Sequence, residues 1–386
     1  MSLLQGFKVL DLASVGPAAR ASRILADYGM EVIKVAPVAS KGAKQTEPVY
    51  HAYGAGRGTK RIRVDLESAA GKEAIYRLAR SVDVMIESFR PGVAQRIGVG
   101  YEQIKAHNPR IVYCSTSGYG QDGPCAQWAG HDINYLAMGG FLACSGRDAA
   151  GRPAIPGATV ADSAGGGMQA AMSIMAALVQ LPRRGEGCYL DVAITDGVLN
   201  LMSLYIDEYL ATGVDTAPES ALLTGKYACY GVYATRDGKA LAVGAIETRF
   251  FANLCRLLEL DQYAPLQYDT ARQREIKAAL SEAFLGRDRD EWTALLAGAN
   301  TCVTPVLGIP EIVANEHFQA RRTFMAAHHP EHGEFRQLAP VLAGNERECA
   351  AHEVRPAGRT DTDAVFGAAG FSAAEIAALR TAGVVE

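Results

Sequence analysis

The sequence predicts an α/β protein that combines a Rossmann-like large domain, built on a parallel sheet, with a smaller α+β domain. Over the first 120 residues, short apolar runs alternate with helical patterns, which is typical of a parallel sheet covered by helices on both faces. Residues 224–246 instead carry tyrosines, glycines and alternating apolar positions, which indicate antiparallel strands. A chain of 386 residues is long enough for two such domains.

The first part of the chain predicts its elements in a regular order. Strand patterns occupy residues 7–12, 31–36, 60–66, 83–88 and 110–116. Helical patterns occupy residues 18–29 and 69–81, and a short helix follows Pro91. Ligands of such sheets bind at the carboxyl ends of the strands, so we expect a site in the loops that follow them.

The turn after the first strand argues against a nicotinamide cofactor. It reads "ASVGPAA" instead of G-x-G-x-x-G, and Pro17 stands where the phosphate-binding turn belongs. The glycines of "GAGRGTK" (54–60) do not directly follow a strand. We therefore expect no dinucleotide site in this domain.

The second part of the chain sets the domain boundaries. A helical stretch runs from about residue 162 to 181, "GCYLDVAITDGVLN" predicts a strand leading into a long helix, and a hairpin turns at 236–239. Helical segments follow through Trp292 and over 310–325, and Ser372 with Glu375 predicts a capped final helix. These patterns place the large domain at 1–185, completed by 330–386, a linker at 186–214 and the small domain at 215–325.

Composition limits the function classes. The 38 Lys and Arg against 42 Asp and Glu leave a net charge of -4, with both signs scattered, so we expect neither nucleic-acid nor membrane binding by bulk charge. The longest apolar run, 168–181, is interrupted by polar residues and predicted too short to span a bilayer, and no signal-peptide pattern opens the sequence. The eight cysteines lie far apart without a C-x-x-C pair, which predicts reduced thiols in a cytoplasmic enzyme.

Two polar positions admit both a chemical and a purely structural interpretation. His131, in "AGHDINYLAMGG" (129–140), follows a glycine at a predicted helix start, so it is either an acid/base group or a surface residue of a cap formed by Asp132 or Asn134. Asp162, in "ATVADSAGGGM", precedes three glycines, as in a chain that passes close to a ligand, but an N-cap of the following helix is equally natural.

Several other polar residues have a surface charge as the simplest explanation. Glu247 ends the predicted strand "KALAVGAIE". Arg57, Lys60, Arg90 and Arg96 lie after or between the first strands, and "FRPG" makes Arg90 the best of them for a pyrophosphate. The run "HHPEH" (328–332) lies in a predicted loop without fixed helical spacing, so we do not expect a metal site there.

Ten segments, in order and over nearly the whole chain, resemble the superfamily of family III CoA-transferases and α-methylacyl-CoA racemases. They are "GFKVLDLAS", "VIKV", "DVMIESFRPG", "IVYCSTSGYGQDGP", "GHDINYLA", "GATVADSAGGGM", "GCYLDVAITDG", "LAVGAIETRFF", "CVTPVL" and "GFSAAEIAALRTAGV". Within the superfamily, "GHDINY" and "VGAIE" resemble the racemase branch. The resemblance implies the family III CoA-transferase fold and an interlocked homodimer.

The resemblance also implies a chemistry, namely inversion of the α-carbon of a 2-methyl-branched acyl-CoA by 1,1-proton transfer through an enolate. His131 and Asp162 then serve as acid/base groups on opposite faces, and Glu247 orients the histidine from the other subunit. The backbone N–H of Asp132 would stabilise the enolate oxygen. No cofactor is implied, because CoA is part of the substrate.

Three points stay open within this resemblance. An acyl-CoA:carboxylate CoA-transferase with Asp162 as the nucleophile is the alternative reaction, and a CoA-thioester-binding protein without turnover is a third. The acyl chain, of fatty-acid, sterol side-chain or arylpropionyl type, is not readable. The family commonly has an acidic residue where this chain has Ala36, so only backbone groups of Val35 and Ala36 remain as contacts for the adenine.

Overall fold

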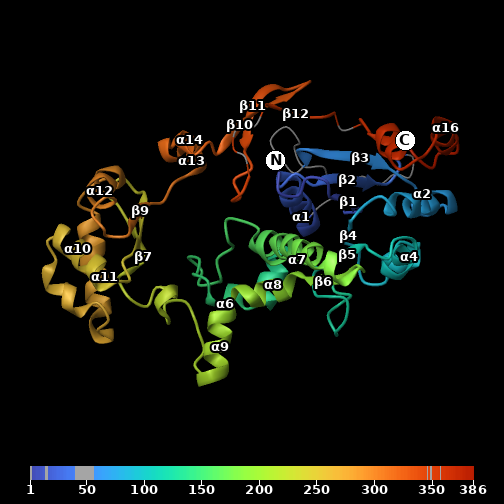
Figure 1. Ribbon diagram of the computed structural model, residues 1–386. Helices are drawn as coiled ribbons and strands as arrows, with labels where there is room; N and C mark the ends of the chain where they lie inside the picture. Colours follow the sequence, from blue (N-terminus) through green and yellow to red (C-terminus); the bar gives the residue numbers. More distant parts are fainter. Residues whose placement is uncertain (1, 14–15, 40–55, 346, 348–349, 357) are drawn as a thin grey trace. The chain divides into compact units, whose positions relative to one another are not determined.

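The computed structural model describes residues 2–13, 16–39, 56–345, 347, 350–356 and 358–386 (Figure 1). The chain forms two compact units. The large unit comprises Met1–Gly139, Pro156–Met202 and Glu316–Glu386, and the small unit comprises Gly140–Ile155 and Ser203–Asn315.

A six-stranded sheet forms the centre of the large unit, in the order β3-β2-β1-β4-β5-β6 (Figure 1). Every neighbouring pair is parallel. This is the Rossmann strand order, in which the direction of winding reverses between β1 and β4 and ligands bind at the carboxyl ends near that point. The predicted α/β class and the parallel sheet are confirmed. The strands are β1 Lys8–Asp11, β2 Glu31–Ala36, β3 Thr59–Arg63, β4 Val84–Glu87, β5 Val112–Ser117 and β6 Cys188–Ala193.

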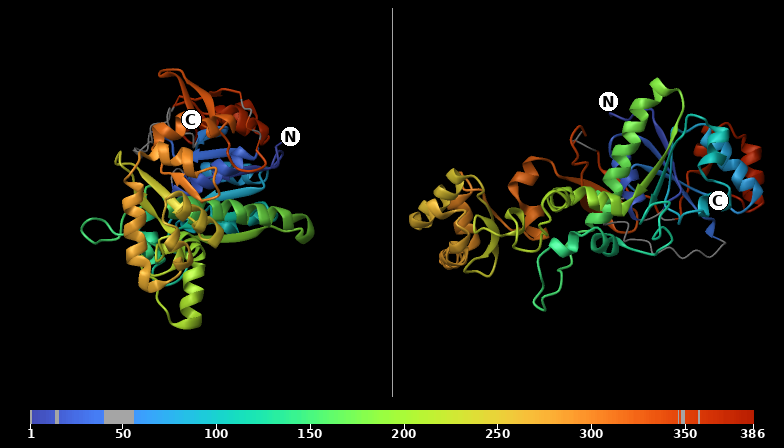
Figure 2. Two further views of the ribbon diagram at one scale, coloured as in Figure 1. Left: turned by 90° about the vertical axis from the view of Figure 1, so that its left-hand side faces the viewer. Right: turned by 90° about the horizontal axis from the view of Figure 1, so that it is seen from below.

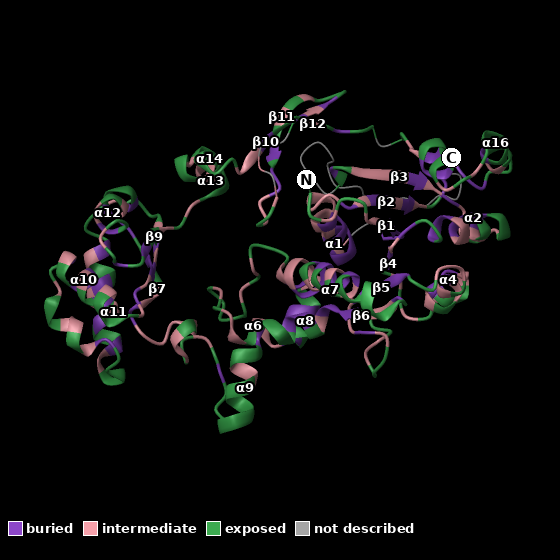
Figure 3. Cartoon of the chain, in the orientation of Figure 1, coloured by how far each residue is buried: buried purple, intermediate pink, exposed green. Residues whose placement is uncertain are grey.

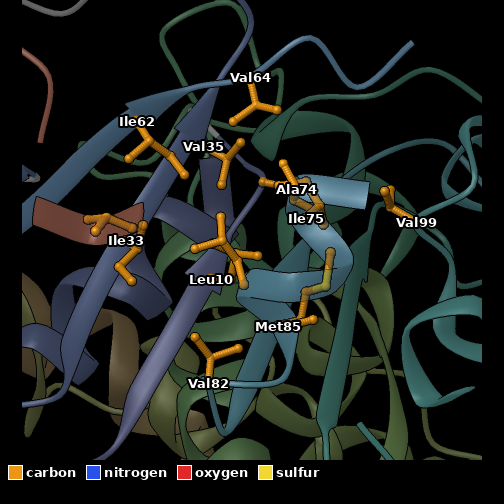
Figure 4. Close-up of a cluster of buried hydrophobic side chains, with 14 of the residues drawn as sticks. Leu10, Ile33, Val35, Ile62, Val64, Ala74, Ile75, Val82, Met85 and Val99 are labelled. Atoms are coloured by element: carbon orange, nitrogen blue, oxygen red, sulfur yellow. The ribbon is translucent and has the colours of Figure 1, made fainter. Parts of the chain in front are cut away.

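Most residues of β1, β4 and β5 are buried (Figure 3). Successive strand residues face opposite sides of the sheet, and each side has its own apolar core. Leu10 and Met85 point to the side shown in Figure 4, where they pack with Ile75. Val9 and Val84, their chain neighbours, belong to the core on the other side. Because both faces are buried, the strands are continuous apolar runs, which is how the sequence pattern indicated a parallel sheet.

Helices cover both faces. The core around Leu10 is closed by α2 Ala69–Ala79, α3 Val93–Ile97, α4 Tyr101–His107, α15 Thr362–Ala368 and α16 Ala373–Thr381. The opposite core is closed by α1 Gly16–Asp27 and α7 Gln169–Arg184. Figure 2 shows α7 as a long rod beside the strands of the sheet.

Helix α7 continues a π-helical segment, η3 Ala161–Met168, without a break. Together they form one helical segment of 24 residues, which by length and composition alone is apolar enough to cross a membrane. The predicted run 168–181 was shorter because it left out η3, so the length argument against a membrane span was wrong. The buried side chains of α7 include Ala170, Ile174 and Leu178, which pack in the core of the large unit.

The last part of the chain returns to the large unit. Helix α16 begins with the predicted capping box, because the Ser372 N–H donates to Glu375 Oε2 at 2.6 Å and the Glu375 N–H donates to Ser372 Oγ at 3.2 Å. A small sheet has the order β11-β10-β12. Its strands are β10 Phe324–His329, β11 Gly333–Leu338 and β12 His352–Glu353, and helix α14 Glu316–Ala320 precedes them.

The small unit contains the predicted hairpin, with antiparallel strands β7 Tyr230–Ala234 and β8 Ala240–Gly244. Strand β9 Val303–Pro305 extends this sheet, and Phe251, Phe284 and Trp292 lie in its core. The helices are α6 Phe141–Cys144, α9 Ser203–Thr212, α10 Thr248–Leu257, α11 Gln273–Phe284, α12 Arg289–Leu296 and α13 Ile309–Ala314. Short 3-10 turns occupy Leu222–Thr224, Asp261–Leu266 and Thr270–Arg272.

The segment 186–214, predicted as a linker, is built differently. It contains β6, then α8 Ile194–Leu201 and α9. The first two belong to the large unit, which extends to Met202, and the return of the chain begins at Glu316 instead of residue 330. The physical reason is that the apolar residues Val192 and Ile194 are buried, which a linker would leave in water.

Candidate active site

His131 lies directly before helix α5 Asp132–Met138, in the N-cap position. The amide of Asn134 caps this helix start, since its Oδ1 accepts the His131 N–H at 3.0 Å. The His131 ring makes no capping hydrogen bond and is exposed. The cap interpretation is therefore correct in part, because Asn134 caps the helix. The cap does not use the His131 imidazole, which stays available for other contacts.

Tyr135 holds the loop that carries His131. Its hydroxyl donates to the Gly130 carbonyl at 2.6 Å, and its ring lies edge-on to Tyr119, with the ring centroids 5.2 Å apart. A Cβ added at Gly118 or Gly130 would meet the Tyr135 ring at 2.5 and 2.7 Å. The two glycines are thus needed so that the loop can pack tightly on this tyrosine.

Asp162 is the second residue of η3 and not its N-cap. The position before the helix is Val160, and no side chain caps this end. The N-cap interpretation of Asp162 was therefore wrong, because the backbone is already helical at Val160. Within the described part of the chain, the Asp162 carboxyl group makes no hydrogen bond.

The α5 start and η3 are joined directly. The Asp162 N–H donates to Asp132 Oδ1 at 2.8 Å, so the residue after His131 holds the backbone of Asp162. His131 is also near enough to Asp162 to lower the pKa of its carboxyl group electrostatically. Two candidates 31 positions apart in the sequence thus lie in one place.

The net effect on Asp162 is a pKa raised above the usual value of a carboxyl group. The largest cause is burial, which disfavours the charged form, and the nearby carboxylate of Asp132 acts in the same direction. Arg20 and His131 act against it, with smaller effects. The protonated form is therefore more populated at a given pH than in an exposed aspartate, which suits a group that both accepts and donates a proton.

The three glycines after Asp162 pack helices together. A Cβ at Gly166 would lie 2.5 Å from Cβ of Pro17 in α1, and one at Gly165 would lie 3.0 Å from the carbonyl oxygen of Ile194 in α8. A Cβ at Gly167 would lie 2.7 Å from Cβ of Arg20. Close contact with a ligand was the predicted reason for this run, and the observed contacts are with the neighbouring helices instead.

Glu247 belongs to the small unit, where it is the N-cap residue of α10 and is exposed. Its carbonyl accepts the N–H groups of Phe250 and Phe251. Its predicted role as the residue that orients His131 requires a second subunit and stays a prediction.

The predicted CoA-binding residues fall at two different edges of the sheet. Arg90 follows the carboxyl end of β4, beside the point where the winding reverses, and Ala36 ends β2 at the same edge, directly after Val35. Arg96 is an exposed residue of the following helix α3. Neither Arg90 nor Arg96 has an ion-pair partner among the described residues, so both are available to phosphate oxygens.

Arg57 and Lys60 lie at the amino-terminal end of β3, the opposite edge. Arg57 Nη2 contacts Asp27 Oδ1 at 2.9 Å and Lys60 Nζ contacts Glu31 Oε1 at 2.9 Å. Both line a cavity of about 360 Å³ that also includes His352. The sheet therefore does not bring these two residues together with Arg90.

In "HHPEH", His328 and His329 are the last two residues of strand β10, and His332 lies in the turn before β11. The segment is thus part of a β-hairpin, and only residues 330–332 lie in the predicted loop. The ligand atoms of His329, Glu331 and His332 lie within 4.8 Å of one another, as a metal site requires. However, Nδ1 of His329 accepts the N–H groups of Glu331 and His332, at 3.0 and 3.2 Å. The neutral ring then carries its proton on Nε2, the nitrogen that a metal would need, so these hydrogen bonds oppose metal binding.

Sequence reasoning missed three charged groups near the carboxyl ends of the strands. Glu87 is buried, which raises its pKa, and its carboxylate accepts the Phe89 N–H at 2.6 Å. Asp11 is also buried and contacts Lys34 and Ser22. Arg20, on α1, is the third, and its Nη2 donates to Thr159 Oγ1 at 2.6 Å. The only signal for the two acids was a carboxylate inside an apolar strand pattern.

Comparisons with known proteins agree with this architecture. The family model of CoA-transferase family III matches residues 4–362. The human protein α-methylacyl-CoA racemase is 32% identical over 384 residues, which cover 99% of this chain and 97% of the human protein. Human succinyl-CoA:glutarate CoA-transferase is 30% identical over 353 residues, covering 88% and 80%.

Solved structures give the same result. The crystal structure of a CAIB/BAIF family protein from Brucella suis superimposes with a TM-score of 0.74 at 25% identity, and the match covers 99% of both chains. The orthorhombic crystal form of Rv3272 from Mycobacterium tuberculosis has a TM-score of 0.76 at 24% identity, over 95% of this chain and 99% of that one. The resemblance drawn from the ten segments is confirmed, and the chain belongs to CoA-transferase family III.

Proposed function

We propose that this enzyme is a cofactor-independent racemase or epimerase of 2-methyl-branched acyl-CoA thioesters. The observation that carries the proposal is the convergence of His131 and Asp162, tied together through the hydrogen bond from the Asp162 N–H to Asp132. An acid/base pair at one carbon is what inversion through an enolate requires. The identity with the human racemase over nearly the full length supports the same choice.

In the proposed reaction, one of the two groups takes the α-hydrogen of the thioester as a proton and the C–H electron pair becomes part of an enolate. The other group returns a proton to the opposite face of the same carbon, so no atom is gained or lost and only the configuration changes. The backbone N–H of Asp132 makes no hydrogen bond within the described chain and is the proposed donor to the enolate oxygen. Proton transfer alone completes this reaction, so no metal or redox cofactor enters the proposal.

The CoA part is assigned to the carboxyl edge of the sheet. Arg90 and Arg96 are proposed to bind its phosphates, and the backbone near Val35 and Ala36 is proposed to contact the adenine. Arg57 and Lys60 are left out of this site, because they lie at the opposite edge of the sheet and form ion pairs there. We further propose a cytoplasmic homodimer in which Glu247 of one subunit orients His131 of the other.

The experiment is hydrogen exchange at the α-carbon. Given a (2R)-methylacyl-CoA in D₂O, the purified protein should incorporate deuterium at that carbon and produce the (2S) isomer. Mass spectrometry measures the deuterium, and chiral chromatography measures the two isomers. His131→Ala should lose about 10²–10⁴-fold in rate, the usual contribution of one acid/base group. If the wild-type protein neither exchanges nor inverts, the proposal is wrong.

CoA transfer is the second candidate function, because CoA-transferases are among the relatives. The Asp162 carboxylate also makes no hydrogen bond to the described residues, so its oxygens are free to act as a nucleophile. In that reaction the Asp162 carboxylate attacks the thioester carbonyl and CoA leaves as its thiolate. The thiolate then attacks the Asp162 carbonyl of the anhydride, which releases the first acid and leaves an Asp162–CoA thioester. The acceptor carboxylate displaces the thiolate from this thioester, and the thiolate attacks the acceptor carbonyl of the new anhydride, which releases the new acyl-CoA and regenerates Asp162. Transfer of CoA to an added free acid, with an adduct trapped on Asp162, would establish it.

A further inference from the structure

Arg20 places a cation beside Asp162 that the proposed proton transfers do not use. It belongs to α1, its Cβ packs against Gly167, and its Nη2 donates to Thr159 Oγ1 at 2.6 Å. Thr159 lies in the turn before η3, and its carbonyl accepts the Ser163 N–H at 3.0 Å. The guanidinium is therefore held against the helical turn that carries Asp162.

The hydrogen bonds of Arg20 are incomplete. Its Nε is buried and has no hydrogen-bond partner in the described chain, and Arg20 makes no ion pair there. A guanidinium has five N–H donors arranged as a planar fork that fits a carboxylate. Among the described residues, the guanidinium donates only to Thr159, so its remaining terminal N–H groups are free to bind a carboxylate.

Asp162 is not the carboxylate that completes Arg20. No hydrogen bond joins the two side chains in the described structure. A direct ion pair would hold the pKa of Asp162 below its ordinary value, whereas burial and Asp132 raise it. The CoA phosphates are assigned to Arg90 and Arg96. Helix α3, which carries Arg96, packs on the opposite face of the sheet from α1, so we assign Arg20 to the acyl part of the substrate beside Asp162.

We propose that Arg20 binds a second carboxylate on the acyl group, so that the preferred substrates are CoA monothioesters of 2-methyl-branched dicarboxylic acids. This inference deepens the proposed function and rests on it. Arg20 is then the residue that selects the acyl chain, and the free terminal N–H groups of its guanidinium bind the carboxylate of such a substrate.

The test compares a charged substrate with a neutral one of similar shape. 2-Methylglutaryl-CoA, with the thioester on the carbonyl next to the branched carbon, and 2,5-dimethylhexanoyl-CoA differ mainly in a terminal carboxylate against an isopropyl group. The measurement is kcat/KM for α-hydrogen exchange in D₂O with each substrate, and the quantity of interest is their ratio. 2-Methylsuccinyl-CoA and 2-methyladipoyl-CoA, with one methylene group fewer and one more, vary the distance between the branched carbon and the terminal carboxylate.

Wild-type enzyme should prefer the best dicarboxylic substrate, and Arg20→Gln should lower the preference ratio by about 10- to 150-fold, the value of one charge-assisted hydrogen-bonded contact. Arg20→Lys should restore part of the ratio, because the charge remains without the planar fork. Arg23→Gln, on the same helix but paired with Asp27 at 2.9 Å, is the matched control and should leave the ratio unchanged.

Two results would overturn the inference while leaving the proposed function intact. One is a wild-type preference for the neutral substrate. The other is an equal loss on both substrates in Arg20→Gln, together with a shifted acid limb of the pH profile, which would make Arg20 a positioning residue for Asp162. If neither substrate exchanges its α-hydrogen, the proposed function fails, and the inference fails with it.

Discussion

A single methyl group at Gly197 should separate the helix that carries Asp162 from its neighbour. Gly197 lies in α8, and a Cβ built on it would be 1.9 Å from the carbonyl oxygen of Gly165 and 2.5 Å from its Cα. Both atoms belong to the backbone of η3, so no side chain can turn away to make room. Gly197→Ala therefore forces α8 and η3 apart by on the order of 1 Å, given normal van der Waals separations.

The expected cost follows from this geometry. Overpacking of a close contact destabilises by about 1–3 kcal/mol, and the better helix propensity of alanine returns roughly 1 kcal/mol of it. A displacement of this size at a catalytic group can lower the rate by about 10²-fold. We expect a modest loss of stability and a much larger loss of α-hydrogen exchange.

Urea unfolding and exchange in D₂O measure the two effects. The matched control is Gly367→Ala, also a helical glycine, in α15, where an added Cβ meets nothing within 4 Å. It should gain up to about 1 kcal/mol in unfolding free energy and keep its exchange rate. If Gly197→Ala behaves like this control in both assays, the packing argument for the glycines around Asp162 is refuted.

Three further predictions concern charge and capping. Asp132→Asn removes a negative charge beside Asp162 and should lower the pKa of the Asp162 carboxyl group. The acid limb of the pH–rate profile should therefore move to lower pH. An unmoved limb would contradict the electrostatic effect of Asp132 on Asp162. Because burial raises the folded-state pKa of Asp162, the folded protein holds this proton more tightly than the unfolded chain, and stability falls as the pH rises through that pKa. Asp162→Asn should therefore gain in unfolding free energy relative to wild type between about pH 4 and about pH 8, measured by urea titration, and a loss over that range would have the wrong sign. Ser372→Ala removes the side-chain acceptor of the α16 capping box and should cost about 0.5–2 kcal/mol by the same titration, whereas Ser372→Gly should lose only a few tenths.

The location of Arg57 shows where residue type and neighbourhood in the sequence are insufficient. The sequence places both Arg57 and Arg90 next to strands of one sheet, and both are cations suited to phosphate. Arg57 precedes β3, whereas Arg90 follows β4, and in a parallel sheet these positions lie at opposite edges. Arg57 is moreover neutralised by Asp27, which is 30 residues earlier in the chain.

The sequence by itself determined the strands of the parallel sheet, the α/β class, the hairpin at 236–239, the α16 cap and the family. These properties depend on periodicity, on turn chemistry and on motifs, all of which are written in residues close together along the chain. The same local information could not exclude the cap interpretation of Asp162, because aspartate before a helical pattern is a normal N-cap.

Only the tertiary structure decided what surrounds Asp162. Its burial, its connection to Asp132, the packing of Gly165 to Gly167 on α1 and α8, and the position of Arg20 all join segments that are far apart in the sequence. Burial and electrostatic interaction depend on distance in space, and the folded backbone sets that distance through the packing of whole helices and strands.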